Sequence, residues 1–393
     1  MKAHKTVLFL GDGMADEPVA ALSRRTPLQT ADTPNMDALA RFGRSGTMLT
    51  LPNGFPTSSD VANMSVLGCD LSTELCGRGP LEAASQGIPL GPDDIAFRVN
   101  LITVDADGIL RDFSGGHIAQ ADAADTIRLL NETLGSDTIR FYPGVSYRNL
   151  MVLSGPEYSD LISYDKPDDL HGHPVAKHLP RTKSTEGQHT AAVLRDLIAR
   201  AADILKGRGA NGIWPWSGGR AGAIHNLCQR YGVKAAVISA VDVINGLGHC
   251  MGMDVIKVPG ATGYIDTNYE GKADAALKAL ADGYNFVYVH VEAIDEVSHA
   301  QDLELKLASI EDFDKRLVGR VMKAGGRDVA YCVMPDHPVP LATGKHTRTP
   351  VPVAVYQPGV PPDSVQTFDE SAARRGELGY LRGSGLMDLL LGS

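Results

Sequence analysis

The chain is poor in cysteine, and its few thiols do not form a recognisable pattern. The 393 residues include five cysteines, an odd number, with no CxxC pair among them. This usage argues against a disulfide framework or a zinc knuckle and is typical of buried thiols in a reducing cytoplasm. We therefore expect a cytoplasmic protein. The cysteines are Cys69, Cys76, Cys228, Cys250 and Cys332.

Long apolar runs and an excess of positive charge are also missing. No segment reaches the apolar length that spans a bilayer, and the start, MKAHKTVLFLGDG, lacks a signal-peptide cleavage pattern. The formal net charge is -10, with 37 basic against 47 acidic residues. Nucleic acids and anionic membranes both require a basic face, so we expect neither as a partner. An anionic substrate would have to be bound by a local cluster of Arg, Lys and metal.

What the chain does contain is the composition and pattern of a soluble α/β protein. Apolar residues make up 43% and charged residues 21%. Strand-like runs at 5–10, 46–51, 233–239, 285–291, 328–334 and 352–356 alternate with helical patterns, which include 34–42 and 302–323. Such alternation predicts βαβ units and a mostly parallel sheet with helices on both faces.

The length and the order of the segments predict two domains. A chain of 393 residues exceeds one ordinary core. Its middle part forms a self-contained α+β set without the metal-ligand pattern, and Gly and Pro lie at both of its ends. We therefore predict a core formed by residues 1–93 and 222–393, interrupted by an inserted α+β cap domain at 94–221. A single continuous α/β domain is the alternative.

Metal-capable side chains gather in short groups near the end of the chain. Two β-rich runs each end in an Asp with a His nearby, and Asp12 follows another apolar run in LFLGDG. Parallel α/β sheets place their sites at the carboxyl ends of strands. Asp and neutral His together suit borderline divalent ions, and two ions can share such a set. The late residues are Asp295 and His299 in DEVSH, Asp336 and His337 in MPDHP, and His346 in TGKHT, whereas Asp302 is assigned to helix capping.

A serine in PTSSDVAN is the candidate nucleophile. Ser59 precedes Asp60 in a polar turn that leads into an apolar-periodic stretch, so its hydroxyl is expected at a helix N-terminus, where an alkoxide and a phosphate are both favoured. A capping serine without chemistry is the simpler local interpretation. Ser58 is equally well placed to cap, so local sequence does not choose between the two serines.

The ordered motifs resemble the archaeal-type, cofactor-independent phosphoglycerate mutases of the alkaline phosphatase superfamily. They cover almost the whole chain, and WPWSGGR is closer to a bacterial branch whose members are sometimes assigned as homoserine kinases. The other motifs that carry the resemblance are GDGMAD, SSDVANMSVLG, GRGPLEAAS, FSGGHI, PGVSYRNL, VISAVDVINGLG, VPGATGYIDT, DEVSH, PDH and TGKHTRTPVPVAVY.

The resemblance implies a fold, a nucleophile and two sets of metal ligands. The fold is an alkaline phosphatase-like core, and the nucleophile is Ser59, the hydroxyl residue directly before the acidic one. A histidine of the bacterial and plant branch is replaced here by Asn63. One divalent ion would bind Asp12, Ser59, Asp336 and His337, and the other Asp295, His299 and His346. We expect Mn²⁺, with Zn²⁺, Co²⁺ and Mg²⁺ as alternatives.

Four cationic side chains of the middle segment are candidates for binding the anionic substrate. Arg148 in GVSYRNL and Arg220 in WSGGR can each offer a bidentate fork to phosphate or carboxylate. His117 follows a glycine pair in FSGGHI, and Arg98 in AFRVN is the fourth candidate. A salt bridge without a binding role is the competing interpretation for each arginine, and most strongly for Arg98.

The predicted function is the interconversion of 3-phosphoglycerate and 2-phosphoglycerate without 2,3-bisphosphoglycerate, through a phosphoserine intermediate. A small phosphorylated substrate is thus the expected partner. The alternative is a phosphotransferase that uses ATP on a small hydroxyl acceptor such as homoserine, although the chain has no P-loop. A metal-dependent sensor without catalysis is a third class, which the complete ligand set disfavours.

Overall fold

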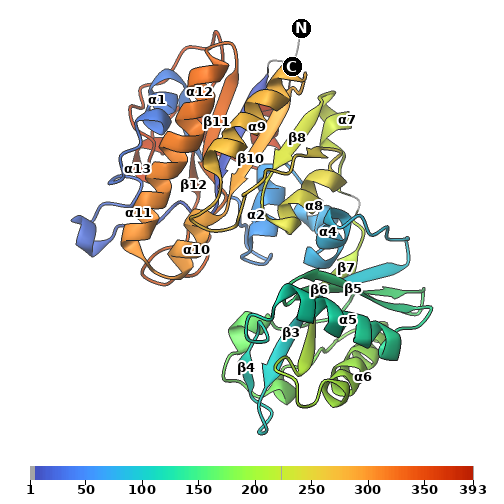
Figure 1. Cartoon of the computed structure of the whole chain (residues 1–393). Helices are drawn as coiled ribbons and strands as arrows, with labels where there is room; N and C mark the ends of the chain where they lie inside the picture. Colours follow the sequence, from blue (N-terminus) through green and yellow to red (C-terminus); the bar gives the residue numbers. More distant parts are fainter. Residues whose placement is uncertain (1–4, 223, 393) are drawn as a thin grey trace. The chain divides into compact units, whose positions relative to one another are not determined.

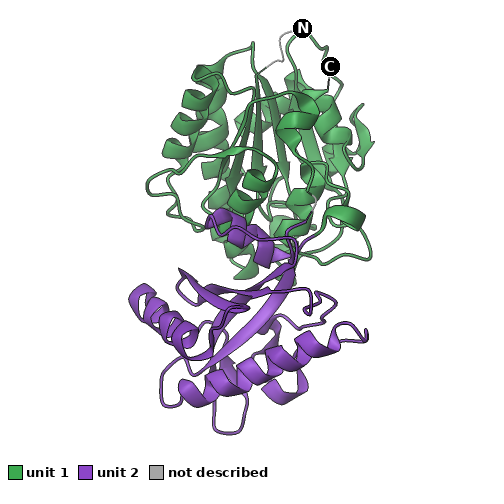
Figure 2. Cartoon of the chain, turned by 90° about the vertical axis from the view of Figure 1, so that its right-hand side faces the viewer, with its two compact units in different colours: residues 1–75, 224–393 green, residues 76–223 purple. Residues whose placement is uncertain are grey.

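The computed structural model describes residues 5–222 and 224–392, which form two compact units. Unit 1 comprises Met1–Leu75 and Ile224–Ser393, and unit 2 is Cys76–Ala223 (Figure 2). Unit 2 begins earlier than the 94–221 insertion expected from sequence, because helix α4 (Arg78–Ser85) packs on strands of this unit. Within the described residues, no helix combines the length and apolarity needed to cross a membrane.

Unit 1 contains an eight-stranded sheet in the order β13-β2-β12-β11-β1-β10-β8-β9 (Figure 1). Most neighbours are parallel, whereas β12 runs antiparallel to both β11 and β2. The mostly parallel sheet predicted from sequence is confirmed. The strands are β1 (Thr6–Gly11), β2 (Arg44–Met48), β8 (Ala235–Ile238), β9 (Asp254–Val255), β10 (Phe286–Val291), β11 (Ala330–Pro335), β12 (Val351–Tyr356) and β13 (Gly379–Leu381).

Helices lie on both faces of this sheet. Along β1, Val7 and Phe9 enter a core shared with helices α1, α9 and α11, whereas Leu8 and Leu10 face the other way. The neighbouring Tyr288, in register with Leu8, hydrogen-bonds to α2, which therefore lies on that second face. The helices are α1 (Pro34–Phe42), α2 (Ser59–Val66), α3 (Leu71–Glu74), α7 (Leu227–Tyr231), α8 (Asp242–Cys250), α9 (Tyr269–Ala281), α10 (Ala293–His299), α11 (Leu303–Asp312), α12 (Gly319–Gly325), α13 (Glu370–Ala373) and α14 (Gly385–Leu391), with a 3₁₀ turn at Ala20–Leu22 and a π-helical turn at Phe313–Val318.

The register of the three central strands brings their carboxyl ends together. Gly11, the last residue of β1, pairs with Val291 at the end of β10 and with Pro335 at the end of β11. The polar residues that follow these strands, Asp12 and Asp336 among them, therefore emerge at one edge of the sheet.

Unit 2 is an antiparallel sheet with two long helices on one face. Its order is β4-β3-β6-β5, with β7 paired to β3. Alternate residues of β3, from Ile95 to Leu101, pack with α5 and α6 in a separate core. The elements are β3 (Asp94–Val104), β4 (Leu110–Asp112), β5 (Ile139–Val145), β6 (Arg148–Ser154), β7 (Gly212–Arg220), α4, α5 (Gln120–Leu134) and α6 (Gln188–Ile204), with 3₁₀ turns at Pro167–Leu170 and Val175–Lys177.

Candidate metal centre

Three buried carboxylates gather at the carboxyl edge of the unit 1 sheet. Asp12 and Asp336 are fully buried and Asp295 is 5% exposed. Burial, together with the charges of neighbouring carboxylates, raises the pKa of Asp12 and of Asp336. Among the described residues, Asp12 Oδ1 and Asp295 Oδ1 accept no hydrogen bond. Without a cation, buried carboxylates in this position favour the protonated form, whereas a bound cation would stabilise the ionised form, so the carboxylates fit a metal centre.

His337 completes a first group of ligands. Its Nε2 lies 3.2 Å from Asp12 Oδ1, 3.3 Å from Asp336 Oδ2 and 3.3 Å from Ser59 Oγ. Burial lowers the pKa of His337, with the neighbouring His346 contributing, so the imidazole is neutral at physiological pH. The structure thus brings together Asp12, Ser59, Asp336 and His337, the set that the family resemblance implies for one ion.

Asp295, His299 and His346 form the second group. His299 Nε2 lies 3.3 Å from Asp295 Oδ2 and 2.9 Å from His346 Nε2, and His346 Nε2 lies 3.4 Å from Asp295 Oδ1. Burial alone would lower the pKa of His299, but the carboxylate of Asp295 outweighs it and raises the pKa to about 9. His299 and Asp295 both lie on α10, one helical turn apart.

The two groups are contiguous. The rings of His337 and His346 stack with their centroids 3.8 Å apart. Ligand atoms of Asp295, His337 and His346 also lie within 4.8 Å of one another. The arrangement can therefore hold two cations side by side, with Ser59 next to the first group.

Ser59 is the first residue of α2, and Asn63 one turn later fixes it. Ser58 is the N-cap, with extended backbone. Asn63 Nδ2 donates to Ser59 O at 2.8 Å and to Asp336 Oδ2 at 3.0 Å, and Tyr288 OH donates to Asn63 Oδ1. Asn63 thus joins the serine helix to a candidate ligand.

Sequence reasoning missed a histidine that positions Asp12. His290, on β10, places Nε2 3.0 Å from Asp12 Oδ2, and Ser239 Oγ lies 3.1 Å from its Nδ1. Burial lowers the pKa of His290 to about 3, so the neutral ring donates to the carboxylate. The buried Lys272 donates to His290 O at 2.8 Å. The only available signal was a histidine within the otherwise apolar run NFVYVHV.

The four substrate candidates of unit 2 have different surroundings. Arg98 is buried, with Nη1 3.0 Å from Glu82 Oε1, and Arg220 donates to the backbone carbonyls of Pro92 and Tyr158. Arg148 is exposed at the start of β6, with its guanidinium 5.2 Å from the ring centroid of Tyr147. His117 is exposed, in a left-handed backbone conformation (φ 51°) after two glycines.

A further arginine joins Arg98 within unit 2. Arg78, in GRGPLEAAS, lies 5.9 Å from the centroid of the Trp216 ring, and Arg98 lies 5.1 Å from it. Burial lowers the pKa of Arg98, and the charges of Arg78 and Arg148 add to this effect. Sequence reasoning did not single out Arg78. The glycines on either side of it serve the packing of unit 2, because a Cβ on Gly79 would lie 2.0 Å from Ala96 O and one on Gly77 3.1 Å from Ser217 O.

Comparison with known proteins gives full-length matches. Residues 4–393 match the Metalloenzyme superfamily. The 2,3-bisphosphoglycerate-independent phosphoglycerate mutase of Methanosarcina mazei is 44% identical over 99% of this chain and 100% of its own length. The same-named protein of Methanosarcina acetivorans is 43% identical over 98% and 99%.

Solved structures agree with these matches. A Pyrococcus horikoshii protein superposes with a TM-score of 0.83 and 27% identity, covering 99% of this chain and 97% of its own. The cofactor-independent phosphoglycerate mutase of Thermoplasma acidophilum gives a TM-score of 0.65 and 29% identity, covering 99% and 100%.

Proposed function

We propose that this chain, which belongs to the 2,3-bisphosphoglycerate-independent phosphoglycerate mutases of the Metalloenzyme superfamily, interconverts 3-phosphoglycerate and 2-phosphoglycerate. The observation that carries the proposal is the position of Ser59: its hydroxyl lies 3.3 Å from His337, at the N-terminus of α2 and beside two contiguous ligand groups. A serine nucleophile next to a two-cation site is an arrangement that can catalyse phosphoryl transfer.

We assign Asp12, Ser59, Asp336 and His337 to one ion and Asp295, His299 and His346 to the other. When bound, the ions would lower the pKa of the serine hydroxyl and neutralise the phosphoryl oxygens. The mixture of carboxylates and neutral imidazoles supports Mn²⁺ as the native ion, with Zn²⁺, Co²⁺ and Mg²⁺ as the alternatives for metal replacement to distinguish.

In the proposed reaction Ser59 Oγ attacks the phosphorus of phosphoglycerate. The bond between phosphorus and the substrate oxygen breaks as the bond to Oγ forms, and the product is phosphoserine with free glycerate. The other hydroxyl of glycerate then attacks phosphoserine and releases the isomer. The side chain of Asn63 donates a hydrogen bond to the backbone carbonyl of Ser59 and so holds Ser59 in place. The backbone N-H groups at the start of α2 favour the incoming phosphate.

The substrate's carboxylate and phosphate need hydrogen-bond donors, for which His117, Arg148, Arg220 and Arg98 remain our proposals. Arg148 and His117 are exposed to solvent, where an anion can reach them. Arg220 and Arg98 also contribute to the packing of unit 2 through the carbonyls and the carboxylate that they contact. We further propose that the enzyme acts in glycolysis and gluconeogenesis in the cytoplasm.

The decisive assay mixes the purified protein and Mn²⁺ with either phosphoglycerate isomer, without 2,3-bisphosphoglycerate, and follows both isomers by ³¹P NMR. We expect exchange from both directions. No exchange, together with consumption of ATP that depends on homoserine, would identify the phosphotransferase alternative. Release of inorganic phosphate alone would identify a hydrolase.

A further inference from the structure

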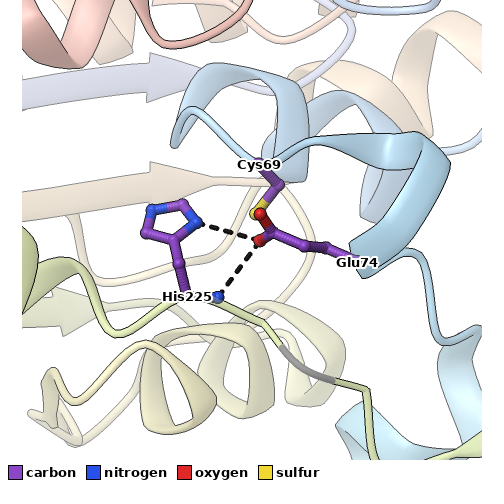
Figure 3. Close-up of side chains that lie close together, drawn as sticks. All are labelled: Cys69, Glu74 and His225. Atoms are coloured by element: carbon purple, nitrogen blue, oxygen red, sulfur yellow. Dashed lines mark hydrogen bonds and ion pairs between the residues drawn. The ribbon is translucent and has the colours of Figure 1, made fainter.

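A second group of metal-type side chains lies in unit 1 and shares no residue with the catalytic ligands. Cys69, Glu74 and His225 each place one ligand atom so that all three lie within 4.8 Å of one another. Cys69 follows α2, Glu74 is the last residue of α3, and His225 precedes α7 (Figure 3). Two distant parts of the sequence thus contribute to one cluster.

The carboxylate of Glu74 is held in place by the backbone. Asp70 N donates to Glu74 Oε1 at 3.2 Å, and His225 N donates to Oε2 at 3.1 Å. Burial would raise the pKa of Glu74, but the hydrogen bonds from His225 and the backbone outweigh it, and the pKa is lowered. Glu74 is therefore a fixed anion and a preorganised oxygen ligand.

The imidazole of His225 is directed at this carboxylate. Nδ1 lies 2.9 Å from Glu74 Oε2, and Figure 3 shows the ring edge that bears Nδ1 turned toward Glu74. Nε2 is buried and makes no hydrogen bond to the described residues, so no competing partner draws the ring away. A cation could take the place of the proton that Nδ1 and Oε2 now share.

Cys69 adds sulfur to this pair. Its side chain is buried, and Figure 3 shows the sulfur beside the carboxylate of Glu74. Sulfur, imidazole nitrogen and carboxylate oxygen together suit Zn²⁺ or Co²⁺ far better than Mg²⁺ or Ca²⁺. Cys69 and Glu74 also line a cavity of about 630 Å³, from which an ion and a water as fourth ligand can enter.

We propose that Cys69, Glu74 and His225 form a binding site for a zinc-type ion. The site lies at the boundary between the two units in the sequence. The first segment of unit 1 ends at Leu75, next to Glu74, and its second segment begins at Ile224, next to His225. A bound ion would join the two segments that lead to and from the inserted unit. Coordinate bonds to the ion would then replace the hydrogen bond between His225 Nδ1 and Glu74 Oε2.

Cobalt titration followed by absorption tests the site, because a Co²⁺ thiolate has a charge-transfer band that oxygen and nitrogen ligands do not give. The catalytic ligand groups contain no sulfur, so the band reports on this cluster alone. With the intact enzyme saturated with Mn²⁺, we expect about one equivalent of Co²⁺ to give the band, and Zn²⁺ to abolish it. Cys69→Ser should remove it.

Two further variants and one control complete the test. Glu74→Gln and His225→Gln should weaken Co²⁺ binding by at least about a hundredfold while circular dichroism stays unchanged, since loss of a direct ligand exceeds the 10–100-fold cost of an outer partner. Cys250→Ser, a partly buried thiol outside the cluster, should keep the band. An absent band in the intact enzyme, or a band that survives Cys69→Ser, would show that Glu74 and His225 form a hydrogen-bonded pair only.

Discussion

At the scale of single residues, the proposed function depends most on Ser59. Its hydroxyl faces the candidate ligands, whereas Ser58 serves as the N-cap of the same helix. We predict that Ser59→Ala lowers isomer exchange by about 10⁴-fold or more, because the substitution removes the proposed nucleophile. Metal content, measured by mass spectrometry, should fall little, since the other ligands remain. Ser58→Ala is the matched control and should keep most of the activity.

His299 makes metal affinity dependent on pH. In the metal-free protein Asp295 raises the pKa of His299 to about 9, so at neutral pH the ring carries a proton that an ion must displace. Affinity should therefore rise with pH up to about 9, by about tenfold per pH unit for one displaced proton. Calorimetry in buffers of different ionisation enthalpy counts the protons released. An affinity that stays constant between pH 6.5 and 8.5 would contradict this linkage.

Individual site residues differed in how well the sequence revealed them. Asp12 and Asp336 were predictable because each directly follows an apolar strand, and the structure brings them together at one sheet edge. His290 was not predictable, since a histidine inside a strand carries no spacing signal and its function depends on the register of β10 with β1. Only the family resemblance indicated Ser59 rather than Ser58 as the nucleophile.

At the scale of elements, Lys306 of α11 joins the loops that follow β1 and β11. Its fully buried Nζ lies 2.8 Å from Asp16 Oδ2 and donates to Val339 O at 2.9 Å. Lys306→Met would leave Asp16 buried without its cation, which costs about 3–5 kcal/mol. We predict a fall of this size in the free energy of unfolding, measured by urea denaturation.

An exposed lysine provides the control for this prediction. Lys278 pairs with Asp282 at 2.7 Å, but both side chains are at least half exposed. Lys278→Met should change stability by no more than about 0.5 kcal/mol, because exposed pairs one helical turn apart contribute little. Equal effects of the two substitutions on the free energy of unfolding would show that burial does not determine how much an ion pair contributes to stability.

Most elements could be predicted from their periodicity, while their arrangement could not. The helix at 34–42 starts with Pro34 after Thr33 as expected, and Asp302 caps α11 by accepting from Leu305 N. The stretch 302–323 is helical but includes a π-helical turn at Phe313–Val318, which apolar spacing does not reveal. The antiparallel direction of β12 also follows from tertiary pairing rather than from local sequence.

At the scale of the whole molecule, the two units have separate hydrophobic cores. All proposed catalytic ligands belong to unit 1, so metal removal should destabilise this unit alone. At a thousandfold excess over Kd each ion contributes about 4 kcal/mol, which corresponds to a shift on the order of 10 °C. In calorimetry we expect a chelator to lower one of two transitions and to abolish activity, with Mn²⁺ restoring both. Equal shifts of both transitions would argue for one cooperative unit.

The family and the fold class were correctly identified from sequence, because the motifs extend over nearly the whole chain and the strands alternate with helices. The start of the inserted unit was harder to locate. Helix α4 lies in the GRGPLEAAS motif, which the sequence analysis assigned to the core. In the structure this helix packs on β3 and β7 of unit 2. Such an assignment depends on contacts between segments that are far apart in the chain.

The position of β1 in the centre of the sheet has a consequence for synthesis on the ribosome. Its two partner strands, β10 and β11, end at Val291 and Pro335. More than 300 further residues must therefore be synthesised before β1 can pair on both sides. At about 5–20 residues per second this delay is roughly 15–65 s. The inserted unit, by contrast, is complete once Ala223 has emerged. We expect nascent chains to contain a folded middle and an unpaired, apolar first strand, which makes this strand a natural binding segment for chaperones.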